Sequence, residues 1–253
     1  MKLQRRQKIE EYVKKYGSVS LDDLCQQFEV SKNTIRRDLN ELEARRIIKK
    51  VYGGVVLNNG EAPSPLSQRQ MTMQAEKAII AEKAATFVKD GDIVVIDAGS
   101  TTARIVEYLK NKRNLTIITN SVPVLTAALA YEQLQVIVTG GDLLRSTNSL
   151  VGMEALTTLK KLNANIGFLA ATGVSLTKGI TNSSTMELEI KRMMIEVSER
   201  IMLLVDHSKF DTVSLVAVAD LQDIDIIVTD ATPPASYVQY CAEHDVKIII
   251  ANP

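Results

Sequence analysis

From residue 74 onward, seven short apolar runs recur with room for a helix between most of them. The runs are Ile93–Asp97, Leu115–Thr119, Gln135–Val138, Ile166–Ala170, Ile201–Val205, Ile226–Thr229 and Lys247–Ile250. Because they are apolar along their length instead of alternating with polar residues, we expect strands that are covered on both faces. Helices are expected between them at Thr102–Leu109, Val122–Ala130, Met186–Ser198 and Ala235–Glu243. The pattern predicts an α/β domain with a largely parallel sheet.

Polar residues and glycines follow several of these expected strands, at the edge where parallel sheets bind ligands. Hydroxyl groups and backbone amides at the start of a helix can hold a phosphate, and a lysine in the late segment adds a cation. Each segment alone could be an ordinary turn, but repetition at successive strand ends favours a binding cleft. The candidate ligand-binding residues are Asp97, Gly99, Ser100, Thr101, Thr102, Thr119, Asn120, Ser121, Gly140, Gly141, Thr172, Gly173 and Lys209.

Residues 30–42 carry a second informative pattern. Ser31 is a good helix N-cap, and Ile35, Leu39 and Leu42 recur at i, i+4 and i+7 as one apolar stripe. The opposite face carries side chains of the kind that grip phosphates and read base edges in the DNA major groove. They are Lys32, Asn33, Arg36, Arg37 and Asn40. A solvated amphipathic helix would show the same pattern, so the neighbouring segments decide between the two interpretations.

Those segments favour DNA binding. Two helical patterns precede residue 30, and Ser20 with Asp23 has the form of a capping box at the start of the second. Residues 47–51 and 55–57 read as strands joined by a turn at Tyr52-Gly53-Gly54. Three short helices followed by a basic hairpin predict a winged helix-turn-helix domain over residues 1–57.

The charges divide the chain at the same place. Residues 1–57 hold 13 Lys or Arg and 8 Asp or Glu, a net charge of +5, whereas the other residues hold 17 and 22, a net charge of −5. A basic domain of this kind suggests a polyanionic partner, because neutralising phosphates releases counterions. Residues 58–73 are rich in Asn and Pro near their start and are expected to be a linker, which leaves 74–253 for the α/β domain.

Composition excludes several classes of protein. At 253 residues, with 45% hydrophobic and 24% charged residues, the chain has the composition of a globular protein. No apolar run approaches the length of a membrane span or follows the first Met, so we expect a cytoplasmic protein with no membrane partner. Two Cys and two His lack zinc-ligand spacing, so no metal is expected. The absence of a Walker P-loop and of a G-x-G-x-x-G fingerprint argues against ATP and NAD, and no cofactor is expected.

The N-terminal motif resembles the DNA-binding signature of the DeoR family of bacterial sugar-operon regulators. The resemblance rests on Val30-Ser31, on residues 34–39, on Leu42-Glu43 and on the turn at residues 52–54. One departure is Arg46, which stands after the third helix where the family usually has Gly. With this resemblance, the expected DNA-binding residues are Ser31, Lys32, Asn33, Thr34, Arg36, Arg37, Asn40, Lys49, Lys50 and Tyr52.

The C-terminal part resembles the sensor domain of the same family, which is itself similar to ribose-5-phosphate isomerase. Residues 97–102, 119–121 and 206–210 carry this resemblance, together with a set that it adds to the ligand-binding candidates. The added residues are Gly152, Glu187 and Lys191. The resemblance implies that the ligand is a phosphorylated sugar or sugar derivative that acts as an effector. Residues 151–154 and 204–210 look most similar to the inositol-catabolism repressors.

A second departure separates the chain from the isomerases. Most family members carry Gly-Ala-Asp where this chain has Ala170-Ala171-Thr172, and in the isomerases a carboxylate from this segment serves proton transfer. Because isomerisation needs a positioned base near the reacting C–H group, we expect no catalytic residues. The expected function is an effector-controlled repressor of a carbohydrate-catabolic operon that binds operator DNA as a dimer or tetramer. The alternatives are a sugar-phosphate isomerase-like enzyme fused to a DNA-binding domain and a constitutive architectural DNA binder.

Overall fold

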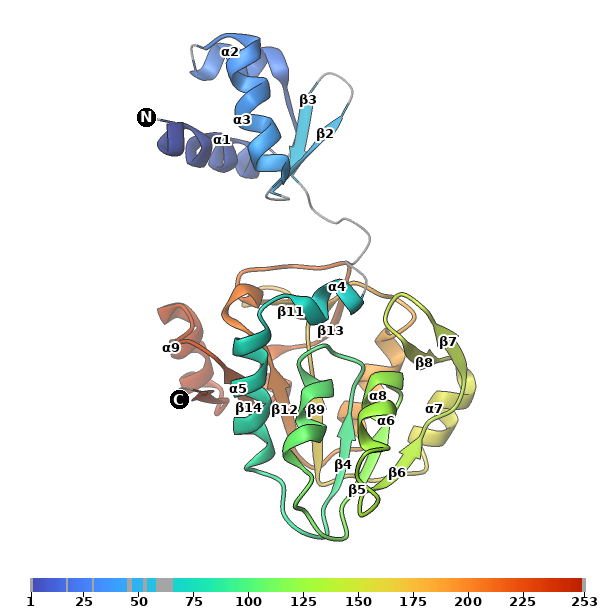
Figure 1. Cartoon of the computed structure of the whole chain (residues 1–253). Helices are drawn as coiled ribbons and strands as arrows, with labels where there is room; N and C mark the ends of the chain where they lie inside the picture. The colour runs from blue at the N-terminus through green and yellow to red at the C-terminus, as the bar shows by residue number, and fades with distance from the viewer. Residues whose placement is uncertain are drawn as a thin grey trace. The chain divides into compact units, whose positions relative to one another are not determined.

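The computed structural model describes residues 2–16, 18–28, 30–44, 47–51, 54–57 and 66–251. The chain forms two compact units, Met1–Glu61 and Ala62–Pro253 (Figure 1). Within the described residues, no helix combines the length and apolarity that a membrane crossing requires.

Unit 1 is a winged helix-turn-helix, as the sequence predicts. Its elements are α1 (Lys2–Tyr16), β1 (Ser18–Ser20), α2 (Leu21–Phe28), α3 (Lys32–Ala44), β2 (Ile48–Val51) and β3 (Gly54–Leu57). The strands pair antiparallel in the order β1-β3-β2, so the expected hairpin gains a third strand before α2. Tyr52, Arg46 and Gly53 lie outside the described residues.

Local capping begins both helices of the motif where the sequence predicts. The Ser31 hydroxyl accepts the Thr34 amide at 3.4 Å at the start of α3. At α2, the Asp23 amide donates to the Ser20 hydroxyl at 3.0 Å and the Ser20 amide donates to the Asp23 carboxylate at 3.3 Å. This reciprocal pair is the expected capping box, and it satisfies two backbone donors that a helix start would otherwise leave unpaired.

Unit 2 contains the expected parallel sheet. Its strands are β4 (Ile93–Ile96), β5 (Thr116–Thr119), β6 (Gln135–Val138), β9 (Ile166–Leu169), β12 (Ile201–Leu204), β14 (Ile226–Thr229) and β15 (Lys247–Ile250). They lie in the order β15-β14-β12-β9-β4-β5-β6, and every neighbouring pair is parallel. The chain leaves β4 for β5 on one side and returns to β9 on the other. The strand order therefore reverses between β4 and β9, where parallel sheets form ligand-binding crevices.

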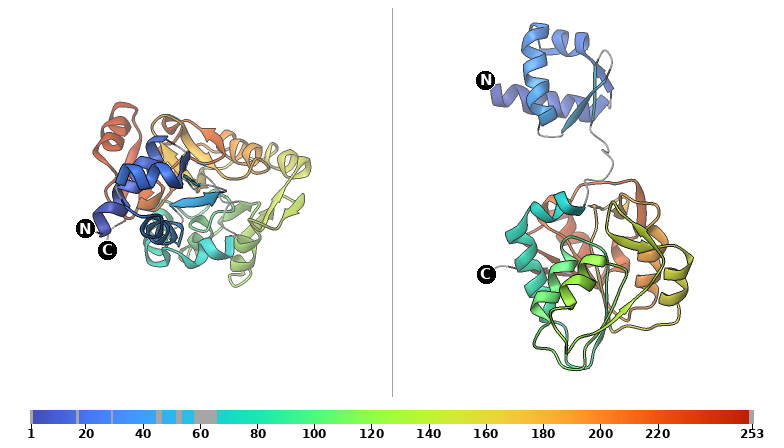
Figure 2. Two further views of the ribbon diagram at one scale, coloured as in Figure 1. Left: turned by 90° about the horizontal axis from the view of Figure 1, so that it is seen from above. Right: turned by 45° about the vertical axis from the view of Figure 1, so that its right-hand side comes forward.

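Helices cover both faces of this sheet (Figures 1 and 2). One core joins α5 (Gln74–Ala85), the 3-10 helix η1 (Thr102–Tyr108) and α6 (Val122–Ala128) to one face of the sheet. The other core joins α7 (Met153–Leu159), α8 (Leu188–Glu196) and α9 (Ala235–Glu243) to the opposite face. Neighbouring residues of β4 show the division, since Val94 and Ile96 belong to the first core and Val95 to the second. The continuous apolar runs follow from this burial on both faces.

Two smaller sheets were not expected from the sequence. Strands β10 (Gly173–Ser175), β11 (Gly179–Asn182) and β13 (Val216–Ala219) form an antiparallel sheet, and β7 (Asp142–Leu144) pairs with β8 (Ser149–Val151). The short 3-10 helices η2 (His207–Lys209) and η3 (Leu221–Asp223) follow β12 and β13. These additions lie between β6 and α7, between β9 and α8, and between β12 and β14.

The expected linker contains a helix. Residues Leu66–Met71 form α4, whose Leu66 is 1% exposed and donates its amide to the Ser146 carbonyl at 3.0 Å. Burial of Leu66 and its backbone bond place this part of the expected linker on unit 2. Residues 58–65 lie outside the described part of the chain.

Candidate functional site

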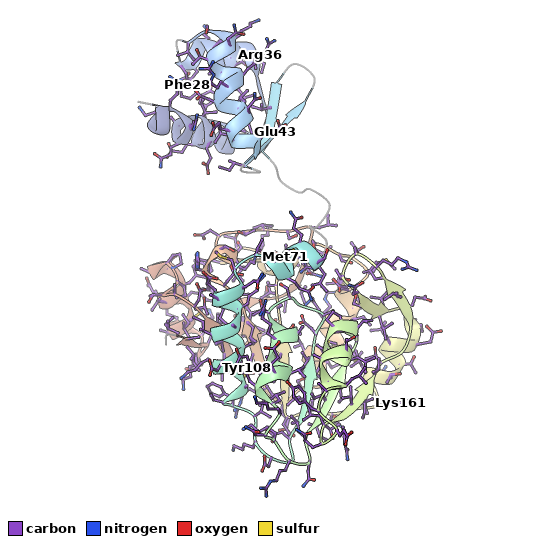
Figure 3. The ribbon with its side chains drawn as sticks, viewed as in Figure 1. Phe28, Arg36, Glu43, Met71, Tyr108 and Lys161 are labelled. Carbon is purple, nitrogen blue, oxygen red and sulfur yellow. The ribbon has the colours of Figure 1, made fainter. Side chains whose placement is uncertain are left out.

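Helix α3 presents its polar residues to solvent. Lys32, Asn33, Arg36, Arg37 and Asn40 are exposed, and Figure 3 labels Arg36 among them. Ile35, Leu39 and Leu42 are at most 1% exposed and pack in the core of unit 1. Ser31 lies at the N-cap and Thr34 is half-buried beside it. Lys49 and Lys50 belong to β2, and Tyr52 lies outside the described residues. The exposed face is one that can enter a DNA groove, and contact with DNA stays a prediction.

A buried carboxylate that the sequence analysis missed fixes the orientation of this helix. Asp38 of α3 is 1% exposed and forms ion pairs with two residues of α1, Arg5 at 2.6 Å and Arg6 at 3.3 Å. Arg6 also contacts Glu41 at 3.1 Å. These pairs hold α1 against the non-recognition side of α3 and engage two of the basic residues that give unit 1 its positive charge.

In unit 2, a pocket of about 150 Å³ opens at the crevice between β4 and β9. Four of the expected ligand-binding residues line it: Ser100, Thr101, Thr172 and Lys209. The remaining lining residues are Arg69, Thr72, Lys77, Ala170, Ala171, Leu204, Val205 and Asp206. The segments after β4, β9 and β12 thus meet at one site, together with residues from α4 and α5.

Three cations surround this pocket, and the sequence analysis found only Lys209. Arg69 comes from α4 and Lys77 from the first turn of α5. Burial lowers the pKa of Arg69, against the opposing effect of the carboxylates of Glu187 and Asp97. Burial also lowers the pKa of Lys77 to about 8; the nearby carboxylate of Asp206 opposes the shift, while the cations of Lys209, Arg69 and Arg104 add to it. An anion in the pocket would relieve this cation–cation repulsion.

A signal for Lys77 was present in the sequence. Ile80, Ala81 and Ala84 follow it at helical spacing and pack in the first core. A helix that precedes the first strand of a parallel sheet and packs on it runs antiparallel to that strand. Its N-terminal turn therefore lies at the edge where the strands end, which is where Lys77 is found.

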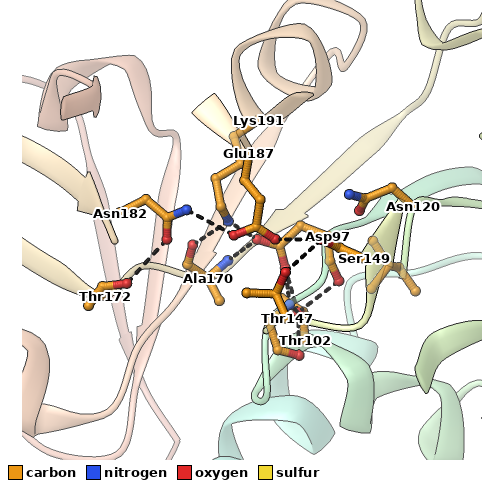
Figure 4. Close-up of polar contacts among 12 residues, drawn as sticks. Asp97, Thr102, Asn120, Thr147, Ser149, Ala170, Thr172, Asn182, Glu187 and Lys191 are labelled. Atoms are coloured by element: carbon orange, nitrogen blue, oxygen red, sulfur yellow. Dashed lines mark hydrogen bonds and ion pairs between the residues drawn. The ribbon is translucent and has the colours of Figure 1, made fainter. Parts of the chain in front are cut away.

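Asp97 holds the loop after β4 in place (Figure 4). One carboxylate oxygen accepts from the Gly99 amide at 3.0 Å and the Thr102 hydroxyl at 2.5 Å. The other accepts from the Ala170 amide at 2.9 Å and forms an ion pair with Lys191, whose ammonium also donates to the Ala170 carbonyl at 2.8 Å. Both partners of the ion pair are buried. The four contacts give Asp97 and Lys191 a positioning role beneath Ser100 and Thr101.

Gly99 is required in this loop by packing. A Cβ atom at this position would lie 2.3 Å from Cβ of Ala170 and 2.7 Å from Oγ1 of Thr102. Both distances are far below van der Waals contact, so the loops after β4 and β9 approach this closely only because residue 99 has no side chain.

Glu187 joins the two smaller sheets (Figure 4). It is 5% exposed, and its two oxygens accept from the Ser149 hydroxyl of β8 at 2.9 Å and from the Asn182 amide of β11 at 3.2 Å. The Asn182 carbonyl oxygen in turn lies 3.1 Å from the hydroxyl of Thr172, which lines the pocket. Glu187 is therefore tied to the pocket wall through one intermediate side chain.

Asp206 is a further residue of the pocket that the sequence candidates did not include. It is fully buried; its Oδ1 accepts from the Ser208 amide at 3.1 Å and from the Ser208 hydroxyl. Its Oδ2 lies 4.0 Å from the Lys209 ammonium and accepts no hydrogen bond from any described residue. The carboxylate compensates part of the positive charge on Lys77 and Lys209.

The other expected binding residues have local partners outside the pocket lining. Thr119 donates to the Ile96 carbonyl at 2.7 Å, Ser121 caps α6 by accepting the Val124 amide at 3.3 Å, and Asn120 donates to the Leu150 carbonyl at 3.0 Å. Glycines 140 and 141 form the turn before β7, Gly152 begins α7, and Gly173 begins β10. These residues shape the loops around the crevice.

Comparison with protein families divides the chain at the same two units. Residues 5–61 match the DeoR-like helix-turn-helix domain, and residues 72–231 match the DeoR C-terminal sensor domain.

Similarity to individual proteins extends over nearly the whole chain. The chain is 44% identical to the HTH-type transcriptional regulator IolR of Bacillus subtilis (strain 168), over 99% of this chain and 100% of that protein. It is 34% identical to the glycerol-3-phosphate regulon repressor of Escherichia coli (strain K12), over 97% of each. Among solved structures, a ribose 5-phosphate isomerase from Methanocaldococcus jannaschii matches with a TM-score of 0.41, 20% identity and 55% coverage of each chain.

Proposed function

The chain belongs to the DeoR family of DNA-binding transcriptional regulators, and we propose that it represses a carbohydrate-catabolic operon until a phosphorylated sugar derivative binds unit 2. The names of the relatives support the repressor role, since one is the repressor of a glycerol-3-phosphate regulon. The similarity to IolR agrees with the resemblance of residues 151–154 and 204–210 to the inositol-catabolism repressors, and it favours that branch of the family.

The observation that carries the effector proposal is the charge of the pocket. Arg69, Lys77 and Lys209 converge on it although residues 58–253 carry a net charge of −5. Ser100 and Thr101 add hydroxyl and backbone donors from the loop that Asp97 holds. Cations beside such donors in a partly buried site suit the charge and the acceptor oxygens of a phosphate.

The hydroxyl groups and the carboxylate of the pocket suit the rest of a sugar derivative. The Thr172 hydroxyl can donate to or accept from ligand hydroxyls, the Asp206 carboxylate can accept from them, and Ala170 and Ala171 provide apolar contact. The enzyme alternative has no support: the relatives are regulators, and residue 172 offers a hydroxyl where the isomerases have a carboxylate.

We also propose that more than one copy of the protein binds each operator. One winged helix-turn-helix contacts few base pairs, so specific binding generally needs two or more copies on a repeated site. The protein would accordingly bind its operator as a homo-oligomer. Light scattering of the operator complex tests this, and full-affinity binding by a monomer would contradict it.

The effector proposal is tested by operator binding measured as fluorescence anisotropy with a panel of three- to six-carbon sugar phosphates. The operator fragment is first selected from random DNA with the wild-type protein. We expect one sugar phosphate of the panel to weaken operator affinity by about 5- to 150-fold, the usual range of coupling between sites. The unphosphorylated sugar should have no such effect.

Two variants localise the response. Lys209→Ala should lose it while keeping effector-free DNA binding, and Lys161→Ala, at an exposed position outside the pocket lining, should respond as the wild type does. An undiminished response in Lys209→Ala, or the absence of any response in the wild type, would contradict the proposal.

A further inference from the structure

We propose that Lys77 binds the anionic group of the effector and, through its bonds to the end of helix α4, transmits effector binding toward the DNA-binding unit. The inference rests on the proposed function, because it assigns a second task to one cation of the same pocket. It adds a route from the ligand to the chain segment that leads to unit 1.

The contacts of the Lys77 ammonium are unusual for a pocket cation. Lys77 as a whole is 3% exposed, and its ammonium donates to two backbone carbonyls, those of Arg69 at 2.5 Å and Thr72 at 2.9 Å. These carbonyls belong to the last turn of α4 and to the residue just after it. A cation at this end of a helix satisfies carbonyls that lack intrahelical partners and interacts favourably with the helix dipole.

Side chains from unit 2 also bond to the segment that connects α4 to α5, which runs from the last turn of α4 to Gln74 and is called the α4–α5 join below. Gln74 donates to the Met71 carbonyl at 3.3 Å, and Arg104 of η1 donates to the Gln70 carbonyl at 3.4 Å. Met73 has a φ of 50°, in the left-handed region that a non-glycine residue adopts at a cost. The join is thus a bent backbone segment whose conformation depends on side-chain donors. Two of these donors also line the pocket: Lys77, and Thr72, whose hydroxyl donates to the Arg69 carbonyl at 3.1 Å.

Helix α4 is the first described element after the segment that connects the two units. Residues 58–65 separate it from β3, and Leu66 anchors its beginning by burial and a backbone bond to Ser146. A change at the α4–α5 join therefore acts on the attachment point of the connection to unit 1. Arg69 strengthens the link, since its side chain lines the pocket while its carbonyl accepts from Lys77.

The positive charges around Lys77 explain why the α4–α5 join should respond to an anion in the pocket. Without an anion, the Lys77 ammonium lies near Arg69, Arg104 and Lys209, and burial together with these cations lowers its pKa to about 8. A phosphate would favour the protonated form of Lys77 and compensate the repulsion among the cations. The bonds from Lys77 to the α4 carbonyls would then strengthen, because a fully protonated donor keeps all its hydrogens.

Hydrogen–deuterium exchange of the full-length protein tests this, with inorganic phosphate and ribose 5-phosphate as separate probes. In the wild type, each bound probe should slow amide exchange by about fivefold or more both in residues 99–103 and in residues 67–77. In Lys77→Gln, the protection of residues 99–103 should persist, through Ser100, Thr101 and Lys209, while that of residues 67–77 is lost. Lys77→Arg should restore part of it, and Lys83→Gln, at an exposed position of the same helix, should match the wild type.

A pH series on the wild type tests the same inference without a substitution. Comparing exchange with and without saturating phosphate at each pH, the protection that phosphate adds to residues 67–77 should increase as the pH rises through about 8, because phosphate-free Lys77 loses its proton there and bound phosphate favours the protonated form. Protection of residues 99–103 without protection of 67–77 would overturn this inference alone, as would retained protection of 67–77 in Lys77→Gln. Protection at neither segment would overturn the proposed function and this inference with it.

Discussion

Replacing Asp97 with Asn should destabilise unit 2 by about 3–5 kcal/mol, the range for breaking a buried ion pair by removing one partner. The Lys191 ammonium is the reason, because its side chain is 9% exposed and Asp97 is its ion-pair partner among the described residues. Asn keeps an oxygen that can accept from the Gly99 amide, and Lys191 keeps its bond to the Ala170 carbonyl at 2.8 Å. The loss should therefore lie toward the lower end of that range.

Urea unfolding followed by far-ultraviolet circular dichroism measures this loss. A domain of this kind has a total unfolding free energy of about 5–15 kcal/mol, so a loss of 3 kcal/mol is a large shift of the midpoint. Lys191→Met in the Asp97→Asn background removes the unpaired charge and should recover most of the stability. Asp245→Asn serves as the control, because Asp245 is exposed and its positive φ suits Asn equally well.

Two results would refute this reasoning. A cost below about 1 kcal/mol for Asp97→Asn would mean that the ion pair contributes as little as an exposed one. A double variant no more stable than Asp97→Asn would mean that the unpaired ammonium is not the source of the loss.

Three further predictions follow from the two units. The Arg36→Ala, Arg37→Ala double variant should lose operator affinity by more than about 1–3 kcal/mol with its fold intact, as measured by gel shift and circular dichroism; a wild-type shift would contradict the assignment of the α3 face. Asp38→Asn should destabilise unit 1, because it leaves Arg5 and Arg6 without their buried carboxylate, and an unchanged unfolding midpoint for that unit would contradict this. Phosphate affinity measured by calorimetry should fall as the pH rises through about 8, because the pKa of Lys77 is lowered to that value and deprotonation removes its charge; a flat profile from pH 7 to 9.5 would exclude Lys77 from the site.

The parallel sheet could be predicted because burial on both faces imposes continuous apolar runs. All seven strands lie where those runs occur, and the winged helix-turn-helix follows from the apolar stripe of α3 and its capping residues. The smaller sheets could not be predicted in this way. Their strands are three or four residues long and mix polar residues with glycine, as in Gly173–Ser175, so they lack a pattern distinct from that of loops.

Only those residues of the candidate site that directly follow a strand could be predicted from the sequence. Ser100, Thr101, Thr172 and Lys209 follow strands directly, so their position at the crevice could be read from the strand pattern. Arg69 and Lys77 both precede the first strand. Arg69 lies in the segment expected to be a linker, and the position of Lys77 follows only from the direction of the helix that precedes that strand.

Asp97 is a residue whose position could be predicted from the sequence but whose role could not. Its position at a strand end suggests contact with a ligand, but residue type and spacing do not reveal that both its oxygens are already occupied by Gly99, Thr102, Ala170 and Lys191. Whether a polar residue faces the ligand or supports the loop depends on its side-chain partners, which only the folded structure supplies.

The most direct test of effector control is reciprocal linkage between the two units. Effector affinity is measured by calorimetry with the sugar phosphate that weakens operator binding, once on the protein alone and once on its saturated operator complex. If one conformational equilibrium joins the sites, operator DNA must weaken effector binding by the same factor by which the effector weakens operator binding, within about 5- to 150-fold. Equal effector affinities with and without operator DNA would contradict the account.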